Sequence, residues 1–142
     1  MEAVLQKVNL LGFLQTQNGL QTELLEKAGN LSGGQCQRLV IARALLRSDS
    51  AVYIFDEAAS NIDVESEELI MNVIHELAKT KTVLLISHRL ANVVQSDQIY
   101  FLKNGTICER GTHAELMEQN GAYRHLYDSQ MVLENYGKEG NA

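Results

Sequence analysis

Three groups of residues in this chain have the types and the order that phosphate chemistry requires. The run Leu31–Gln35 reads Leu-Ser-Gly-Gly-Gln and directly precedes a segment with helical periodicity. Small residues there leave backbone N–H groups unhindered at a helix start, where the helix dipole favours an anion. Asp56 and Glu57 follow one apolar run, and His88 follows another. We interpret these groups as phosphate donors, a metal-and-base carboxylate pair and a histidine, a set that suits nucleotide hydrolysis.

Taken singly, these groups are weak signals. A Ser-Gly-Gly turn usually does no more than begin a helix, and apolar residues before two acids occur in many folds. A lone histidine after a strand is more often structural than reactive. Their shared order and spacing within one short chain therefore carry the functional interpretation.

Two apolar runs predict the strands that position these side chains. Ala51–Phe55 and Thr82–Ile86 are short, continuous and bounded by turn residues, so we expect both to be fully buried parallel strands. Apolar spacing predicts a helix over residues 34–47, and Asp63 is placed to cap the next helix. The alternation of strand and helix predicts an α/β architecture with a parallel sheet.

The two ends of the chain give further local signals. Near the N-terminus, apolar residues at helical spacing predict a helix over residues 2–14 that is broken at Gly12, and a polar surface connection follows it. Asn104-Gly105 is a strong hairpin signal, and Thr112 with Glu115 forms a capping-box pattern. The remaining predicted elements are a short helix at 90–94, strands at 98–102 and 106–109, and a last helix at 122–132.

The composition limits the class of protein. At 142 residues and 45% hydrophobic content, the sequence suits a single globular domain with a substantial core. A formal net charge of −6 argues against a nucleic-acid surface, so we expect no nucleic-acid partner. The sequence has no apolar run near the ~18–20 residues of a membrane span, and residues 1–10 do not read as a signal peptide. Cys36 and Cys108 are far apart and are expected to be reduced thiols.

In this order and spacing, the motifs resemble the nucleotide-binding domain of ABC transporters, specifically of the exporter type. Leu31–Gln35 matches the family's signature motif, and Val52–Glu57 resembles the Walker B strand with its catalytic glutamate. Residues 60–63 resemble the D-loop, although family members more often have Ala-Leu at its two central positions. His88 resembles the switch histidine, and the arginine after it is typical of exporters. Residues 105–116 resemble the exporter C-terminal hairpin and helix, so the resemblance covers nearly the whole chain.

The resemblance implies a chemistry and a set of partners. It implies ATP and Mg²⁺ as ligands, a second nucleotide-binding domain that sandwiches the ATP, and transmembrane domains that place the chain at the cytoplasmic face of the membrane. The resemblance implies that Glu57 is the general base, that His88 contacts the γ-phosphate and that Asp56 binds Mg²⁺. It implies that the ATP bound to the opposite subunit is contacted by the signature residues Ser32, Gly33, Gly34 and Gln35. It also implies that Asp63 communicates between the two ATP sites.

The phosphate-loop sequence Gly-x-x-x-x-Gly-Lys-Ser/Thr does not occur in these 142 residues. The resemblance therefore implies an incomplete P-loop NTPase domain, with a parallel sheet core, a C-terminal β-hairpin and helices. Residues 1–47 correspond to a helical-subdomain portion with the signature helix, residues 48–134 to a catalytic-core portion, and residues 135–142 to a frayed tail. We predict that the isolated chain hydrolyses ATP negligibly. We also predict that it self-associates through an apolar strand edge at Thr82–Ile86.

Two other interpretations compete with an ATPase portion of an exporter. The chain could be a non-catalytic remnant or an interaction module that offers its signature face to another ATPase subunit. The chromosome ATPases of the SMC class share a similar signature and acidic pair. They need long heptad segments before the signature and a basic DNA path, and residues 1–30 show neither.

Overall fold

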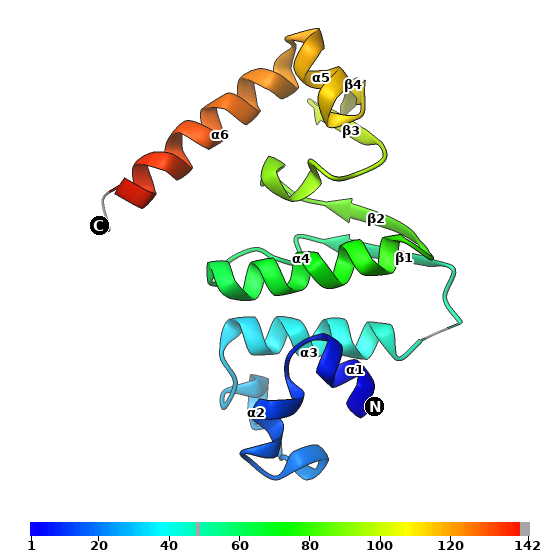
Figure 1. Cartoon of the computed structure of the whole chain (residues 1–142), viewed down its shortest axis with the longest axis vertical. Helices are drawn as coiled ribbons and strands as arrows, with labels where there is room; N and C mark the ends of the chain where they lie inside the picture. The colour runs from blue at the N-terminus through cyan, green and yellow to red at the C-terminus, as the bar shows by residue number, and fades with distance from the viewer. Residues whose placement is uncertain (48, 140–142) are drawn as a thin grey trace. The chain divides into compact units, whose positions relative to one another are not determined.

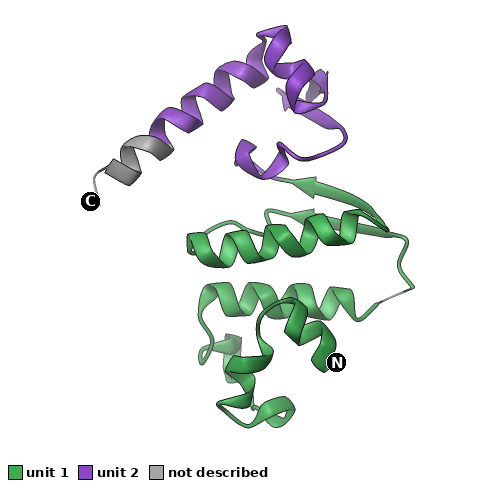
Figure 2. Ribbon diagram, in the orientation of Figure 1, with its two compact units in different colours: residues 1–86 green, residues 87–142 purple. Residues whose placement is uncertain are grey.

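The computed structural model describes residues 1–47 and 49–139, with side chains up to residue 133. Contacts within the chain divide it into two compact units, residues 1–86 and residues 87–142 (Figure 2). The first unit carries the signature residues and the acidic pair, and the second begins one residue before His88.

The N-terminal helical stripe is two short helices, α1 (Glu2–Lys7) and α2 (Leu11–Gln15). The predicted break at Gly12 is wrong, because α1 ends earlier, at Lys7, and Gly12 lies inside α2. Asn9 adopts a left-handed φ of 52°, and the N–H of Leu10 donates to the Leu5 carbonyl at 2.9 Å. This is a Schellman-type ending, in which an asparagine tolerates the left-handed backbone.

Two longer helices form the body of the first unit. The polar connection contains two short 3₁₀ turns, η1 (Gly19–Gln21) and η2 (Glu26–Ala28), and leads into α3 (Gly33–Leu45); α4 (Val64–Ala78) follows after β1 (Val52–Asp56). Figure 1 shows α4 between α3 and the strands of this unit. The core between these layers includes Ile41, Ala42, Tyr53, Phe55, Ile70, Met71 and Ile74.

Strand β1 pairs in parallel with β2 (Thr82–Ile86), and Asp56 lies opposite Ile86 at the end of the ladder. The parallel pairing confirms the prediction, but the prediction that both strands are fully buried is wrong. Burial alternates along β1, and Ile54 is 65% exposed. In the described part of the chain α4 covers one face of this two-stranded sheet, so the other face presents apolar side chains to solvent. These side chains are Val52, Ile54, Leu84 and Ile86, called the open face below.

The second unit contains η3 (Leu90–Val93), the antiparallel strands β3 (Ile99–Lys103) and β4 (Thr106–Gly111), and the helices α5 (His113–Gln119) and α6 (Ala122–Glu139). Asn104 and Gly105 have φ values of 52° and 75°, as a two-residue primed turn requires, which confirms the predicted hairpin. The predicted capping box is also present, since the Thr112 hydroxyl accepts from the Glu115 N–H and the Glu115 carboxylate accepts from the Thr112 N–H.

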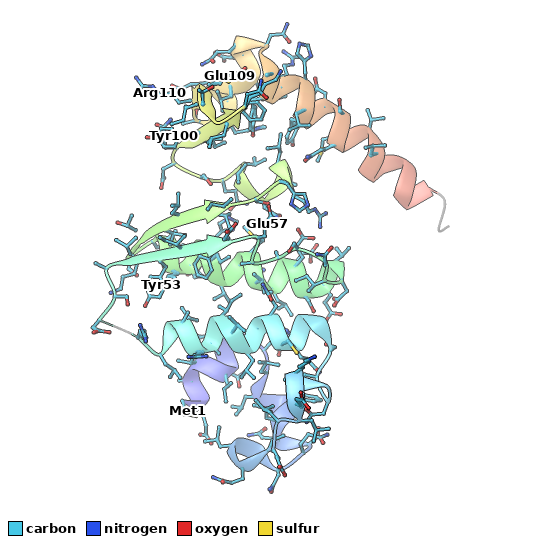
Figure 3. The ribbon with its side chains drawn as sticks, turned by 180° about the vertical axis from the view of Figure 1, so that it is seen from behind. Met1, Tyr53, Glu57, Tyr100, Glu109 and Arg110 are labelled. Atoms are coloured by element: carbon cyan, nitrogen blue, oxygen red, sulfur yellow. The ribbon has the colours of Figure 1, made fainter. Side chains whose placement is uncertain are left out.

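Helix α6 runs past its predicted end at Val132 and has helical backbone to Glu139; residues 140–142 of the predicted frayed tail lie outside the described residues. Its first turn is capped by Glu109 of β4, which is labelled in Figure 3. The Glu109 carboxylate accepts from the N–H groups of Ala122 at 2.6 Å and Tyr123 at 3.1 Å. Burial raises the pKa of the Tyr123 hydroxyl, which is hydrogen-bonded to His113 Nδ1 at 2.8 Å. The hairpin thus fixes where α6 begins.

Candidate functional site

The signature turn, residues 31–35, ends in the N-cap of α3. The Ser32 hydroxyl accepts from the Gln35 N–H at 3.2 Å, and the Gln35 side-chain oxygen accepts from the Ser32 N–H at 2.9 Å. This capping box satisfies one amide of the first helical turn. The amides of Gly33 and Gly34 precede the first residue that can bond within the helix. Ser32 and Gly33 are exposed and Gly34 is buried, so the exposed Gly33 N–H and the positive end of α3 form the part of this turn that suits an anion.

The two glycines of the turn have different surroundings. A Cβ on Gly33 would meet nothing within 4 Å, so this position is open on the side where a ligand could approach. A Cβ on Gly34 would lie 2.2 Å from Ser66 Oγ and 2.7 Å from Ser66 Cβ. Gly34 is therefore required for the close packing of the start of α3 against the start of α4. Gly33 has no such packing function.

Asp63 is the N-cap of α4, as predicted, and its carboxylate accepts from the Ser66 N–H at 2.8 Å. That hydrogen bond, then one from the Ser66 hydroxyl, lowers the pKa of Asp63 below its ordinary value, and the Arg38 guanidinium adds to the effect. Arg38 also donates to the Gly34 carbonyl at 3.3 Å and to the Asn9 carbonyl at 3.1 Å. Charge and hydrogen bonding thus connect the D-loop aspartate with the helix of the signature turn.

The acidic pair lies where β1 ends, and Glu57 is labelled in Figure 3. Asp56 is exposed, and Glu57 has a left-handed φ of 51°, which is costly for a residue with a Cβ. Hydrogen bonds hold this backbone in place. The Glu57 N–H donates to the Ile86 carbonyl at 3.0 Å, and its carbonyl accepts from the Ser60 hydroxyl at 2.9 Å. Strain of this kind, maintained by surrounding bonds, is typical of functional positions.

A magnesium ion would have few protein ligands here. No group of three or more histidine, cysteine, aspartate or glutamate side chains suited to a metal occurs among the described residues. Mg²⁺ usually keeps several waters and binds through one or two carboxylates together with substrate phosphates. The exposed carboxylate of Asp56, the last residue of β1, meets that requirement.

His88 belongs to the second unit and is exposed. Its loop is held by side chains on both sides. The Ser87 hydroxyl accepts from the Arg89 N–H at 3.0 Å, and the side-chain amide of Gln130, from α6, donates to the His88 carbonyl at 2.7 Å. The same Gln130 amide accepts from the Leu90 N–H at 2.9 Å.

Sequence reasoning missed three of these supporting residues. Gln130, Ser66 and Arg38 act through contacts between elements, and nothing in their local pattern marks them. The left-handed backbone of Glu57 was missed as well, because its sequence neighbours have no turn signal that demands a positive φ. The structure brings Ser32, Gly33, Gly34, Gln35 and Asp63 together at the adjoining starts of α3 and α4.

Comparisons with known proteins agree with these motifs. The ABC transporter family model matches residues 1–60, a stretch that includes the signature turn and the acidic pair. An uncharacterized ABC transporter ATP-binding protein of Haemophilus influenzae is 51% identical over 140 residues, which are 99% of this chain and 25% of that protein. An ATP-dependent lipid A-core flippase of Mannheimia succiniciproducens is 53% identical over 114 residues, 80% of this chain and 19% of the flippase. The chain thus spans about a quarter or less of the length of these relatives.

A solved structure agrees with the sequence matches. A bacterial Atm1-family ABC exporter with ATP bound superposes on 91% of this chain and 23% of its own, with a TM-score of 0.81 and 32% identity. The resemblance of the fold to a P-loop NTPase of this class is thereby confirmed. The chain belongs to the ABC transporter family and carries part of an exporter-type nucleotide-binding domain.

Proposed function

We propose that this chain supplies the signature turn, the acidic pair and the switch histidine of an ATP site in an exporter-type ABC subunit, and that the intact subunit couples ATP hydrolysis to transmembrane export. The observation that carries the proposal is the geometry of Glu57. Glu57 directly follows a strand-end aspartate, and the Ile86 carbonyl of β2 and the Ser60 hydroxyl hold its left-handed backbone, which is the kind of maintained strain that functional positions often carry.

The proposed roles follow from the family motif to which each group belongs. Glu57 orients and deprotonates the attacking water as general base. Asp56 holds Mg²⁺, which when bound neutralises charge that develops on the phosphates. His88 contacts the γ-phosphate. This set of side chains suits phosphoryl transfer because that reaction asks the protein mainly for positioning and charge stabilisation.

The signature turn acts on the nucleotide of a second nucleotide-binding domain. Ser32 and the amide of Gly33 are exposed, so they can donate to phosphate oxygens from outside this chain. Gln35 orients the turn through the capping box, and Gly34 allows α3 to begin against α4. Asp63 lies at that junction and transmits changes between the two ATP sites.

Transmembrane domains are the other proposed partners, and they place the chain at the cytoplasmic face of a membrane. Within the described residues, no helix has both the length and the apolar character that crossing a bilayer requires. In this proposal the membrane-crossing segments come from other parts of the assembly, and the nature of the exported substrate is set there.

A chimera tests the proposal. Residues 1–142 replace the matching 140-residue stretch of the Haemophilus influenzae relative, so that an upstream region from that protein is joined to this segment. We expect Mg-ATP turnover by the chimera and negligible turnover by the isolated 142 residues. A chimera that dimerises on ATP without turnover would instead favour a non-catalytic interaction module.

A charge placed on the signature turn tests its role separately. Gly33→Glu adds an acid to the first turn of α3, where the helix dipole tolerates it and no atom lies within 4 Å of the new Cβ. The protein should therefore fold normally, while the carboxylate repels phosphate and lowers turnover. Gly33→Lys, of similar size and opposite charge, should lose less turnover than Gly33→Glu. Equal turnover for the two variants would contradict phosphate binding at this turn.

A further inference from the structure

The side chain of Gln130 connects α6 with the loop that carries His88. Its amide nitrogen donates to the His88 carbonyl at 2.7 Å, and its amide oxygen accepts from the Leu90 N–H at 2.9 Å. One side chain thus holds the two peptide groups that flank Arg89. Gln130 is separated from these partners by about forty residues in sequence, and it is partly buried.

These bonds replace a helix cap that the loop lacks. Leu90 is the first residue of η3, so its N–H cannot bond within the helix, and the preceding residue makes no side-chain cap. The N–H of Arg89, one residue before Leu90, donates to the Ser87 hydroxyl at 3.0 Å. The His88 carbonyl, the Arg89 N–H and the Leu90 N–H are therefore all hydrogen-bonded by side chains.

The helix that carries Gln130 is itself fixed. Glu109 caps the first turn of α6, and Tyr123 in that turn is fully buried against the His113 ring. The Arg124 guanidinium adds a bond of 3.1 Å to the Met117 carbonyl at the end of α5. Gln130 therefore reaches the His88 loop from a helix whose start is anchored to the hairpin.

We propose that Gln130 is a positioning residue for the switch histidine, setting the backbone from which the His88 side chain reaches the nucleotide. The inference rests on the proposed function, in which His88 contacts the γ-phosphate. Gln130 does not touch the nucleotide and acts through His88. A glutamine suits this task because one amide group supplies both the donor and the acceptor. Loss of the clamp lets the His88 carbonyl and the Leu90 N–H rotate towards water, so the histidine reaches its productive position less often.

A double-mutant cycle in the chimera tests the clamp. The variants are Gln130→Ala, His88→Ala and the combination, with Ser129→Ala as the matched control on the same turn of α6. Gln130→Ala should lower kcat about tenfold and leave KM for ATP within about twofold, because a misplaced histidine affects the chemical step more than nucleotide binding. The double variant should have the same kcat as His88→Ala alone. Ser129→Ala should leave both constants unchanged.

Gln130→Glu separates positioning from folding. The glutamate keeps an acceptor for the Leu90 N–H but turns a carboxylate oxygen towards the His88 carbonyl oxygen, so kcat should fall while the thermal midpoint stays near that of the control. Hydrogen–deuterium exchange should accelerate at residues 88–92 in both Gln130 variants and in no other segment of the second unit.

Two results would overturn the inference in distinguishable ways. An equal loss from Gln130→Ala with and without His88 would refute the clamp alone, since Gln130 would then act independently of the histidine. Full turnover by His88→Ala would refute the histidine's role in the proposed function, and the positioning role of Gln130 with it.

Discussion

Gly34 and Ser66 approach so closely that a Cβ on the glycine would lie 2.2 Å from the serine hydroxyl oxygen and 2.7 Å from its Cβ. The contact joins the first turn of α3 to the first turn of α4, where Asp63 is the cap. The second glycine of the signature turn therefore has a packing function inside this chain. The first glycine remains open to a ligand from outside.

Gly34→Ala should destabilise the fold, and Gly33→Ala should not. The hydroxyl of Ser66 could rotate away from the new methyl group, but its Cβ cannot, so α3 and α4 must separate slightly. We expect a loss of about 1–3 kcal/mol in the free energy of unfolding, the usual cost of overpacking. Urea denaturation of the two variants checks this. A Gly34→Ala protein as stable as Gly33→Ala would contradict the close contact.

Backbone strain at Glu57 predicts an unusual order of substitutions. Because φ is 51° there, Glu57→Gly should be at least as stable as Glu57→Ala, and up to about 1 kcal/mol more stable. At Ser129, within α6, the order should be the ordinary one, with alanine about 1 kcal/mol better than glycine. Urea midpoints for the four variants give the comparison. Alanine ahead of glycine by the same margin at both positions would mean that Glu57 is not strained.

Local signals in the sequence were sufficient for most elements of this fold. The capping box at Thr112, the Asn104-Gly105 turn and the Asp63 cap each depend on residues within four positions of one another, and all three are present as predicted. The start of α3 at the signature turn is local in the same way. Such features can be predicted from the sequence because the residues that form them are close together in it.

Features that depend on distant partners were not readable. The exposure of Ile54 follows from what covers the sheet, and an apolar run cannot report that. The left-handed turn at Asn9, just past the end of α1 at Lys7, is local and was missed for another reason, because the nearby Gly12 looked like the stronger breaker. Gln130 is hydrogen-bonded to a residue about forty positions away in sequence. Glu109 caps α6, from which it is separated by the whole of α5.

Acid should weaken two helix starts. Hydrogen bonds from Ser66 lower the pKa of Asp63 below 3.8, and bonds from Thr112 lower the pKa of Glu115 below 4.5. A pKa that is lower in the folded state adds stability above the unfolded value, and this stability is lost as the pH falls through the folded value. The stability advantage of the parent over Asp63→Asn and Glu115→Gln should therefore be constant near pH 7 and shrink below about pH 4. Denaturation curves across this range measure it, and an advantage that grows on acidification would contradict the assignment.

Glu109→Ala should uncap α6. The substitution leaves the N–H groups of Ala122 and Tyr123 without their acceptor, at an expected cost of about 1–2 kcal/mol, as for other lost helix caps. Glu118→Ala, at an exposed glutamate of α5, is the matched control, and its free energy of unfolding should stay within about 0.5 kcal/mol of the parent value. Thermal and urea unfolding of the pair gives the comparison. Equal stability of the two variants would show that the carboxylate does not hold α6.

The open face of β1 and β2 should drive self-association of the isolated chain. Ile54 and Leu84 are half or more exposed on a sheet that has two strands in the described part of the chain. Sedimentation should detect oligomers, and Ile54→Thr with Leu84→Thr should reduce them. Ile107→Thr, at an exposed isoleucine of the hairpin, should have a smaller effect. A parent chain that stays monomeric at high concentration would contradict this prediction.

The most direct measurement of the central claim is the Mg-ATP turnover of the chimera with Glu57→Gln, beside the control Glu68→Gln on the exposed side of α4. General-base catalysis contributes about a hundredfold to ten-thousandfold, so Glu57→Gln should lower kcat by at least about a hundredfold while ATP still binds. Glu68→Gln should keep the parent rate. Turnover by Glu57→Gln at the rate of Glu68→Gln would show that this glutamate is not the base.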